Sequence, residues 1–408
     1  MVYCLFVTIS QFERKQARLR AALEAAAARL APHFPNPAAA ATAATYLQSL
    51  LSQVARKNSW QLAEAAGRDN PYGFQHLLGR AQWDAEAVRD AQRQEVLAGL
   101  GQEDAVLAID ESGTVKQGTQ SAGVARQYCG ASGKIDNCQV GVFLSWQRAK
   151  GHALIDRALY LPREWTDDPA RCRAAGIPEG VPFATKPELA RRMVERTLEA
   201  GARPAWVVAD AVYGADSKLR FFLEGRDQPY VVAVSSQQSV WGAFGEQRVK
   251  TLAAPLPAEA WQRLKVGAGT KGPRLFDWAA VSINHPYNPR HWQRSRAVAP
   301  FLQRSRGHQL LLSLWPGRHA AQRTGPRPAT ILRRHRPLSP STERQEAFGI
   351  QGQHFFEPHV VLPAVVEVVL VQEAFAKAEL ELGQADALWV IGEGKAALVR
   401  NVVSLPWI

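Results

Sequence analysis

Two acidic residues follow apolar runs in the same way, at well separated places in the chain. Asp110 follows Ala105–Ile109 (AVLAI), and Asp210 follows Ala205–Ala209 (AWVVA). Such runs are typical of buried strands, and ligands of sheets with helix crossovers gather beyond the carboxyl ends of strands. Carboxylate oxygens are the ligands that Mg²⁺ prefers. One Asp after a strand is more often a turn former or a helix cap, so it is the pair that indicates a metal site.

The residues before this point have a helical pattern. Apolar and charged side chains recur at three- and four-residue spacing up to about Gly101, which predicts a helical domain over residues 1–101. Its basic residues fit either a DNA-binding surface or a merely solvated one. We expect helices over Phe12–Leu30, Ala38–Val54 and Ser59–Ala66, with Ser59 as a cap, then a helix that Asp69, Asn70 and Pro71 begin, and one over Asp84–Leu100.

The middle of the chain alternates strand and helix patterns. Ser112, Gly113 and Gly118 are expected to end the first strand just after Asp110. The predicted order is three strands, a helix, a strand, a helix and a strand. The later elements are Gln139–Trp146, His152–Leu161, a helix over Lys186–Ala200, Ala205–Ala209, a helix over Asp216–Glu224, and Tyr230–Ser235.

This order is that of the ribonuclease-H-like fold, in which the first and fourth strands are neighbours and carry metal-binding carboxylates. The fold class predicted is therefore α/β, with a ribonuclease-H-like mixed sheet, flanking helices and a preceding α-helical N-terminal domain. The core is expected over residues 102–292.

The charge and composition of the chain indicate which kinds of molecule it binds and in which compartment it works. The 408 residues carry a net charge of +12 with a pI near 9.8, which indicates a polyanionic partner such as nucleic acid. Residues 278–342 contain 11 Arg, no Lys and no acidic residue. The four cysteines lack the spacing of a zinc site and are expected to be free thiols in a reducing compartment. No signal peptide or bilayer-length apolar run is found, which predicts a soluble intracellular protein without a membrane partner.

Several short sequence motifs of this chain match those of one protein family. The chain resembles bacterial insertion-sequence transposases of the DDE type, of the insertion-sequence seven-hundred-and-one group related to insertion sequence four. The similarity extends from about Tyr46 to Trp278. The matching words are NSWQLAE from Asn58, DESGTVKQGTQSAGVARQYCG from Asp110, NCQVGVFLSW from Asn137, HALIDRALYLPREWTDD from His152, FATKPELARRM from Phe183 and VADAVYG from Val208.

The resemblance implies that Asp110 and Asp210 are the first two acids of a catalytic triad and metal ligands. Ala211 stands where the family commonly has an acid. The third acid lies, in the family, in a helix that this chain does not reproduce. Glu373 in VQEAFAKAELELG is the best candidate for it, although the expected Lys beyond it is absent. Residues 293–345 are expected to be a basic segment that is either disordered or read from a shifted frame, followed by a divergent segment over 346–408.

The resemblance also implies Mg²⁺ or Mn²⁺ as cofactor and double-stranded DNA as partner, both transposon inverted-repeat ends and target DNA. It leaves a homodimer open and implies a cytoplasmic, nucleoid-associated bacterial protein. Lys116, Arg126 and Lys134 fit either phosphate contacts or ordinary surface cations. The function implied is DNA strand cleavage and transfer, impaired if the third acid is missing. The alternatives are a non-catalytic DNA-binding relic and a metal-dependent nuclease or resolvase of the same fold.

Overall fold

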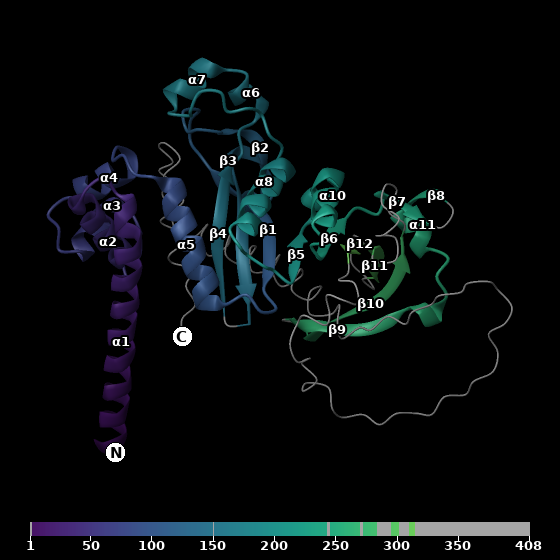
Figure 1. Cartoon of the computed structure of the whole chain (residues 1–408), viewed down its shortest axis with the longest axis horizontal. Helices are drawn as coiled ribbons and strands as arrows, with labels where there is room; N and C mark the ends of the chain where they lie inside the picture. The colour runs from purple at the N-terminus through teal and green to yellow at the C-terminus, as the bar shows by residue number, and fades with distance from the viewer. Residues whose placement is uncertain are drawn as a thin grey trace. The chain divides into compact units, whose positions relative to one another are not determined.

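The computed structural model describes residues 2–149, 151–242, 245–269, 272–283, 295–301 and 310–314. These residues fall into two compact units, one that runs up to Phe222 and one that begins at Leu223. Figure 1 shows the helices and strands of both units with their labels. Glu373 and most of the predicted segment over 293–345 lie outside the described residues.

The first hundred residues are helical, as the periodicity predicts (Figure 1). Asn36 and Asp84 begin two of the helices: the Asn36 side chain accepts from one backbone N–H of the first turn, and that of Asp84 accepts from two. The cap predicted at Ser59 was wrong. Asn58 has the extended backbone of a cap, and its side chain accepts from the N–H of Gln61 at 2.9 Å. The helices are α1 Val2–Leu30, η1 Ala31–His33, α2 Pro37–Leu50, α3 Ser59–Ala65, α4 Tyr72–Gly79 and α5 Ala85–Leu100.

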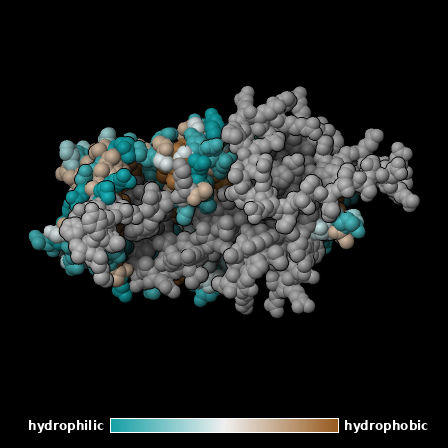
Figure 2. All heavy atoms as spheres, turned by 90° about the horizontal axis from the view of Figure 1, so that it is seen from below, coloured by the Kyte–Doolittle hydropathy of each residue, from teal (hydrophilic) through white to brown (hydrophobic). Residues whose placement is uncertain are grey.

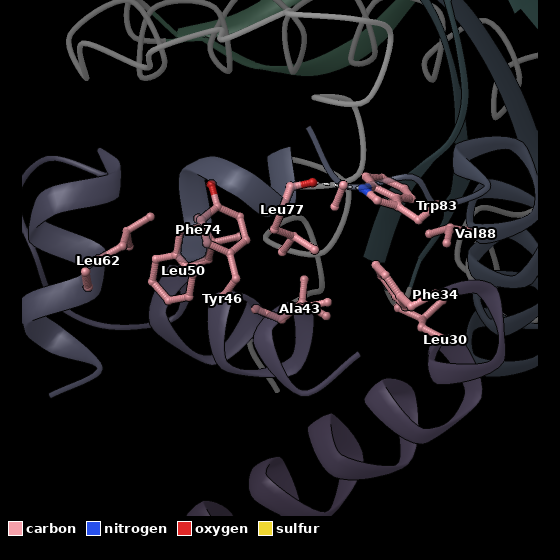
Figure 3. Packing of buried hydrophobic residues seen from close by; sticks show 13 residues of the cluster. Leu30, Phe34, Ala43, Tyr46, Leu50, Leu62, Phe74, Leu77, Trp83 and Val88 are labelled. Atoms are coloured by element: carbon pink, nitrogen blue, oxygen red, sulfur yellow. Dashed lines mark hydrogen bonds between the residues drawn. The ribbon is translucent and has the colours of Figure 1, made fainter. Parts of the chain in front are cut away.

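These helices share a hydrophobic core whose side chains come from α1 to α5 (Figure 3). Tyr46 and Phe74 meet edge to face with ring centroids 5.0 Å apart. The buried indole of Trp83 satisfies its N–H by donating to the carbonyl of Leu77 at 2.9 Å, the dashed line of Figure 3. The amphipathic pattern of the sequence therefore buries one continuous cluster.

A mixed sheet forms the centre of the first unit. Strand β1 lies between β3, with which it is antiparallel, and β5, with which it is parallel. Both β2 and β4 pair with β3. The strands are β1 Val106–Val115, β2 Ala125–Cys129, β3 Lys134–Arg148, β4 Gly151–Leu159 and β5 Trp206–Ala209, with η2 Gly130–Ser132 between β2 and β3.

Two predictions for these strands were wrong. The first strand does not end at Asp110, because β3 continues the antiparallel ladder as far as the pair Val115 and Cys138. Gly113 lies inside β1 and lets another strand approach, since a Cβ there would stand 2.8 Å from the sulfur of Cys129. The order also contains one strand more than predicted, because β2 adds to the sheet.

Helices flank this sheet, as the predicted fold class requires. Helix α8 packs on β3 and β4, and α5 packs on β4. The caps at Thr185 and Asp168 begin α8 and α7. The helices after β4 are α6 Arg163–Thr166, α7 Pro169–Ala174, α8 Lys186–Glu199, α9 Ala211–Gly214 and α10 Ser217–Gly225, the last of which begins in this unit and ends in the second. Cys129, Cys138 and Cys172 are free thiols, as predicted.

A buried ion network joins α5, β4 and α8. Asp156 of β4 is fully buried, and its carboxylate accepts two hydrogen bonds of 2.6 Å from Arg196. Arg93 and Arg89 of α5 stand 3.4 and 3.7 Å from the same carboxylate. Both α5 arginines also pair with Asp90 at the rim. We call Asp156 with these three arginines the arginine network.

The second unit is built from antiparallel strands. In its larger sheet the order is β6-β12-β11-β10-β9, and β7 and β8 form a separate hairpin. Residues 295–301 and 310–314, which lie in the stretch 278–342 that has no acidic residue, thus belong to strands. The elements are β6 Tyr230–Val234, β7 Ser239–Gly242, β8 Gly245–Arg248, α11 Val249–Ala253, η3 Ala258–Ala260, β9 Gln262–Gly269, β10 Gly272–Ser282, β11 Ser295–Phe301 and β12 Leu310–Leu314.

The described surface is mainly hydrophilic in the view of Figure 2. Among the described residues, none of the helices combines the length and the apolar character that a bilayer-crossing segment needs.

Candidate active site

Asp110 and Asp210 follow directly after residues that pair with each other. Ile109 of β1 and Ala209 of β5 are the last pair of the parallel ladder. Because the two strands run in the same direction, the next residue of each lies at the same edge of the ladder. The structure therefore brings the two predicted acids to neighbouring positions of the sheet.

The two aspartates have different local surroundings. Asp110 is inside strand β1, and its carboxylate accepts from the N–H of Glu111 at 2.8 Å. Asp210 ends β5 and caps the single turn α9, where it accepts from the N–H of Val212 at 2.8 Å and of Tyr213 at 3.4 Å. Asp210 is therefore a helix cap, as one of the two interpretations of the sequence holds. Both capping bonds go to one carboxylate oxygen, so the cap does not use the other.

Sequence reasoning missed Glu111. Its carboxylate receives the ammonium of Lys186 at 2.8 Å on one oxygen and the hydroxyl of Tyr213 at 2.5 Å on the other. Lys186 is the first residue of α8, and Tyr213 belongs to α9. Glu111 and Tyr213 lie in the motifs DESG and AVYG, next to the predicted acids, and Lys186 lies in the motif ATKP. We call Asp110, Glu111, Asp210 and Lys186 the carboxylate site.

Among the four residues of the carboxylate site, acids outnumber cations. Burial raises the pKa of Asp210, and the neighbouring Glu111 raises it further, while the N–H groups of Val212 and Tyr213 and the ammonium of Lys186 act against this rise. Burial and Glu111 also hold the pKa of the Tyr213 hydroxyl well above its ordinary value, so that it stays a donor. These four residues contribute three carboxylates and one ammonium, and a bound cation would lessen the repulsion between the carboxylates.

The carboxylate oxygens of this site are the type of ligand that binds a divalent metal ion. Carboxylate oxygens suit Mg²⁺ and Mn²⁺, and Mg²⁺ is commonly held by one or two carboxylates together with water and substrate phosphates. No group of three ligating side chains within the described ranges is arranged to hold a metal ion. Asp110 and Asp210 would be the protein ligands, and Glu373, the residue predicted to be the third, lies outside the described residues.

The cations predicted to contact DNA lie along one stretch of the same sheet. Lys116 directly follows β1, and its carbonyl accepts from the amide of Asn137 at 2.8 Å. Arg126 of β2 and Lys134, the first residue of β3, are both exposed. Lys134 stands 3.8 Å from Asp136. Their use as phosphate contacts stays a prediction.

Comparison with known proteins agrees with the fold and with the resemblance. The family model of DDE superfamily endonucleases matches residues 29–270, more than half of the chain. The chain belongs to this family of endonucleases. It is similar to a probable transposase for insertion sequence element IS701 from Microchaete diplosiphon, with 31% identity over 191 residues.

This similarity covers 47% of the chain and 47% of that relative, so the match spans about half of the relative's length. Together the two matches confirm the predicted relationship and the ribonuclease-H-like fold class. The range of the family model includes the whole carboxylate site and ends before Glu373.

Proposed function

We propose that this chain is a transposase that cleaves DNA strands at the terminal inverted repeats of an insertion sequence and transfers them to target DNA. The observation that carries the proposal is the parallel pair Ile109 and Ala209, each followed by an aspartate. Membership of the endonuclease family and the similarity to an insertion-sequence transposase support the same function.

The chain's own residues would act as binding and positioning groups. Asp110 and Asp210 would hold Mg²⁺ or Mn²⁺, and Glu373 is proposed as the third acid. The bound metal would activate the attacking water or 3′-hydroxyl and stabilise the charge on the phosphate. The capping bonds from Val212 and Tyr213 fix one oxygen of Asp210, which orients the carboxylate before substrate arrives.

The net charge of +12 suits a DNA partner. We propose that Lys116, Arg126 and Lys134 contact phosphates, and that the helical residues 1–101 help to hold the duplex. We further propose that the protein works in the bacterial cytoplasm at the nucleoid, with a dimer as the simplest assembly that could hold two element ends.

A cleavage assay with the purified full chain tests this function. The substrate is a duplex that carries the inverted repeat flanking the encoding gene, and the control is a duplex of the same composition in shuffled order, both in Mg²⁺. We expect nicks at the repeat end of the matched duplex. Equal cutting of both duplexes would indicate a general nuclease, and specific binding without cutting in Mg²⁺ or Mn²⁺ would indicate a non-catalytic relic.

A further inference from the structure

The ammonium of Lys186 is placed where a phosphate could reach it. It lies 2.8 Å from Glu111 and 5.8 Å from the centre of the Tyr160 ring. The side chains of Lys186 and Glu111 are 20% and 19% exposed. An ammonium has three donors, and one of them meets Glu111. The pair is thus neither enclosed in the core nor fully solvated, and a ligand at the carboxylate site can approach it.

Glu111 is held on its buried side as well. Tyr213 is completely buried, and its hydroxyl donates to the carboxylate oxygen that Lys186 does not take. With one oxygen bound to the tyrosine, the other can point in few directions, and the ammonium that it receives is fixed in turn. Elements β1, α8 and α9 therefore meet through this one carboxylate.

Glu111 itself is poorly suited to replace the third acid of the site. Both of its oxygens already accept short hydrogen bonds from within the chain. Taking a metal would require the loss of at least one of these bonds, and loss of the tyrosine bond would leave a buried hydroxyl without its acceptor. The arrangement favours Glu111 as a positioning residue and Lys186 as the group that faces the substrate.

We propose that Lys186 contacts a phosphate of the DNA strand at the carboxylate site, and that Glu111 and Tyr213 position its ammonium for this contact. The inference rests on the proposed transposase function for the identity of the substrate. Its chemistry is that of a fixed cation beside a phosphate that gains charge as the strand is cut. The competing view is that Lys186 only neutralises Glu111.

Removing both charges together separates these two views. The variants are Lys186→Gln, Lys186→Arg and the double change Glu111→Gln with Lys186→Gln, which keeps the total charge of the site. Lys218→Gln is the matched control, since it removes a cation from the exposed face of α10 in the same part of the chain. Thermal melting followed by circular dichroism shows whether each variant folds, and Lys186→Arg keeps the ion pair if the neutral variants melt early.

Two quantities are measured with matched inverted-repeat DNA. One is the cleavage rate in Mg²⁺, and the other is the slope of log affinity against log salt, in Ca²⁺, which takes the same oxygen ligands. We expect Lys186→Gln and the double variant to cut about 100-fold more slowly and to lose about one unit of salt slope. Lys186→Arg should retain the slope, and Lys218→Gln should match the unmodified chain.

Recovery of the cleavage rate and the salt slope in the double variant would overturn the proposal, because Lys186 would then only balance Glu111. An unmodified chain that binds the repeat and does not cut it would refute the transposase activity alone. In that case the salt slopes still decide whether Lys186 contacts a phosphate.

Discussion

The arginine network and the carboxylate site are two charged clusters in the same unit, with opposite balances. At the arginine network the chain supplies its own counter-charges: three arginines surround Asp156, and Asp90 pairs with two of them. Within the described residues that form the carboxylate site, three acids are accompanied by the ammonium of Lys186. A cluster whose charges are paired within the chain supports the fold, whereas one in which acids outnumber the described cations favours the binding of a cation.

The largest effect that follows from this contrast is on DNA cleavage. Asp110→Asn and Asp210→Asn should each slow strand cutting by about a thousandfold or more, because bound metal contributes several kcal/mol to the transition state. Binding to repeat DNA should change little. The measurement is the single-turnover rate beside the affinity. Asp168→Asn is the control, since Asp168 caps α7 in the way that Asp210 caps α9 and Asn keeps the capping acceptor. Equal loss of binding would assign Asp210 a structural role.

The second largest effect is expected on the free energy of unfolding, when the arginine network is broken. Asp156→Asn leaves Arg89 and Arg93 buried without their shared carboxylate, which costs about 3 to 5 kcal/mol when a buried pair is broken. Urea unfolding of the full chain measures this loss. A change below about 1 kcal/mol would mean that the network behaves like a surface ion pair, and the contrast between the two clusters would fail.

A smaller change in the free energy of unfolding, this time a gain in stability, is expected at the carboxylate site. Asp210→Asn removes a half-buried charge that Glu111 repels, and Asn retains the cap of α9. Unfolding in EDTA should therefore show a gain of about 1 kcal/mol. Destabilisation under these conditions would show that the chain, without metal, already balances the charge of Asp210.

The smallest effect on stability concerns the balanced, partly exposed ion pairs of Glu188 with Arg191 and Arg192. Hydrogen bonds from Arg191 and Arg192 lower the pKa of Glu188 to about 2 from its ordinary 4.5. The stabilisation is therefore complete above pH 4.5 and is lost as the pH falls from 4.5 towards 2. Because these i,i+3 and i,i+4 pairs are partly exposed to solvent, their contribution is limited to about 0.5 kcal/mol. Unfolding at pH 7 and pH 3 should show the loss, and Glu188→Gln should reduce the difference between the two pH values by that amount.

The sequence predicted the element order and the two aspartates because apolar runs and local words carry that information. It did not reveal that β1 continues past Asp110, because the glycine and serine residues there are typical of turns, whereas the pairing with β3 is a non-local contact. Glu111 was missed for the same reason. Its partners Lys186 and Tyr213 are 75 and 102 residues away in the chain, and spacing in one sequence does not show which side chains converge.

The strand order of the second unit has a consequence for synthesis on the ribosome. All five residues of strand β6 are buried, and the strand pairs antiparallel with β12. The ladder runs from the pair Val234 and Leu310 to the pair Tyr230 and Leu314, so it joins residues that are far apart in the chain. Until Leu314 has left the ribosomal tunnel, this antiparallel edge of β6 has no partner. A nascent chain would expose an apolar edge strand during that interval. Premature termination before Leu310 should therefore yield a product prone to aggregation rather than a shorter folded protein, because β12 would be missing.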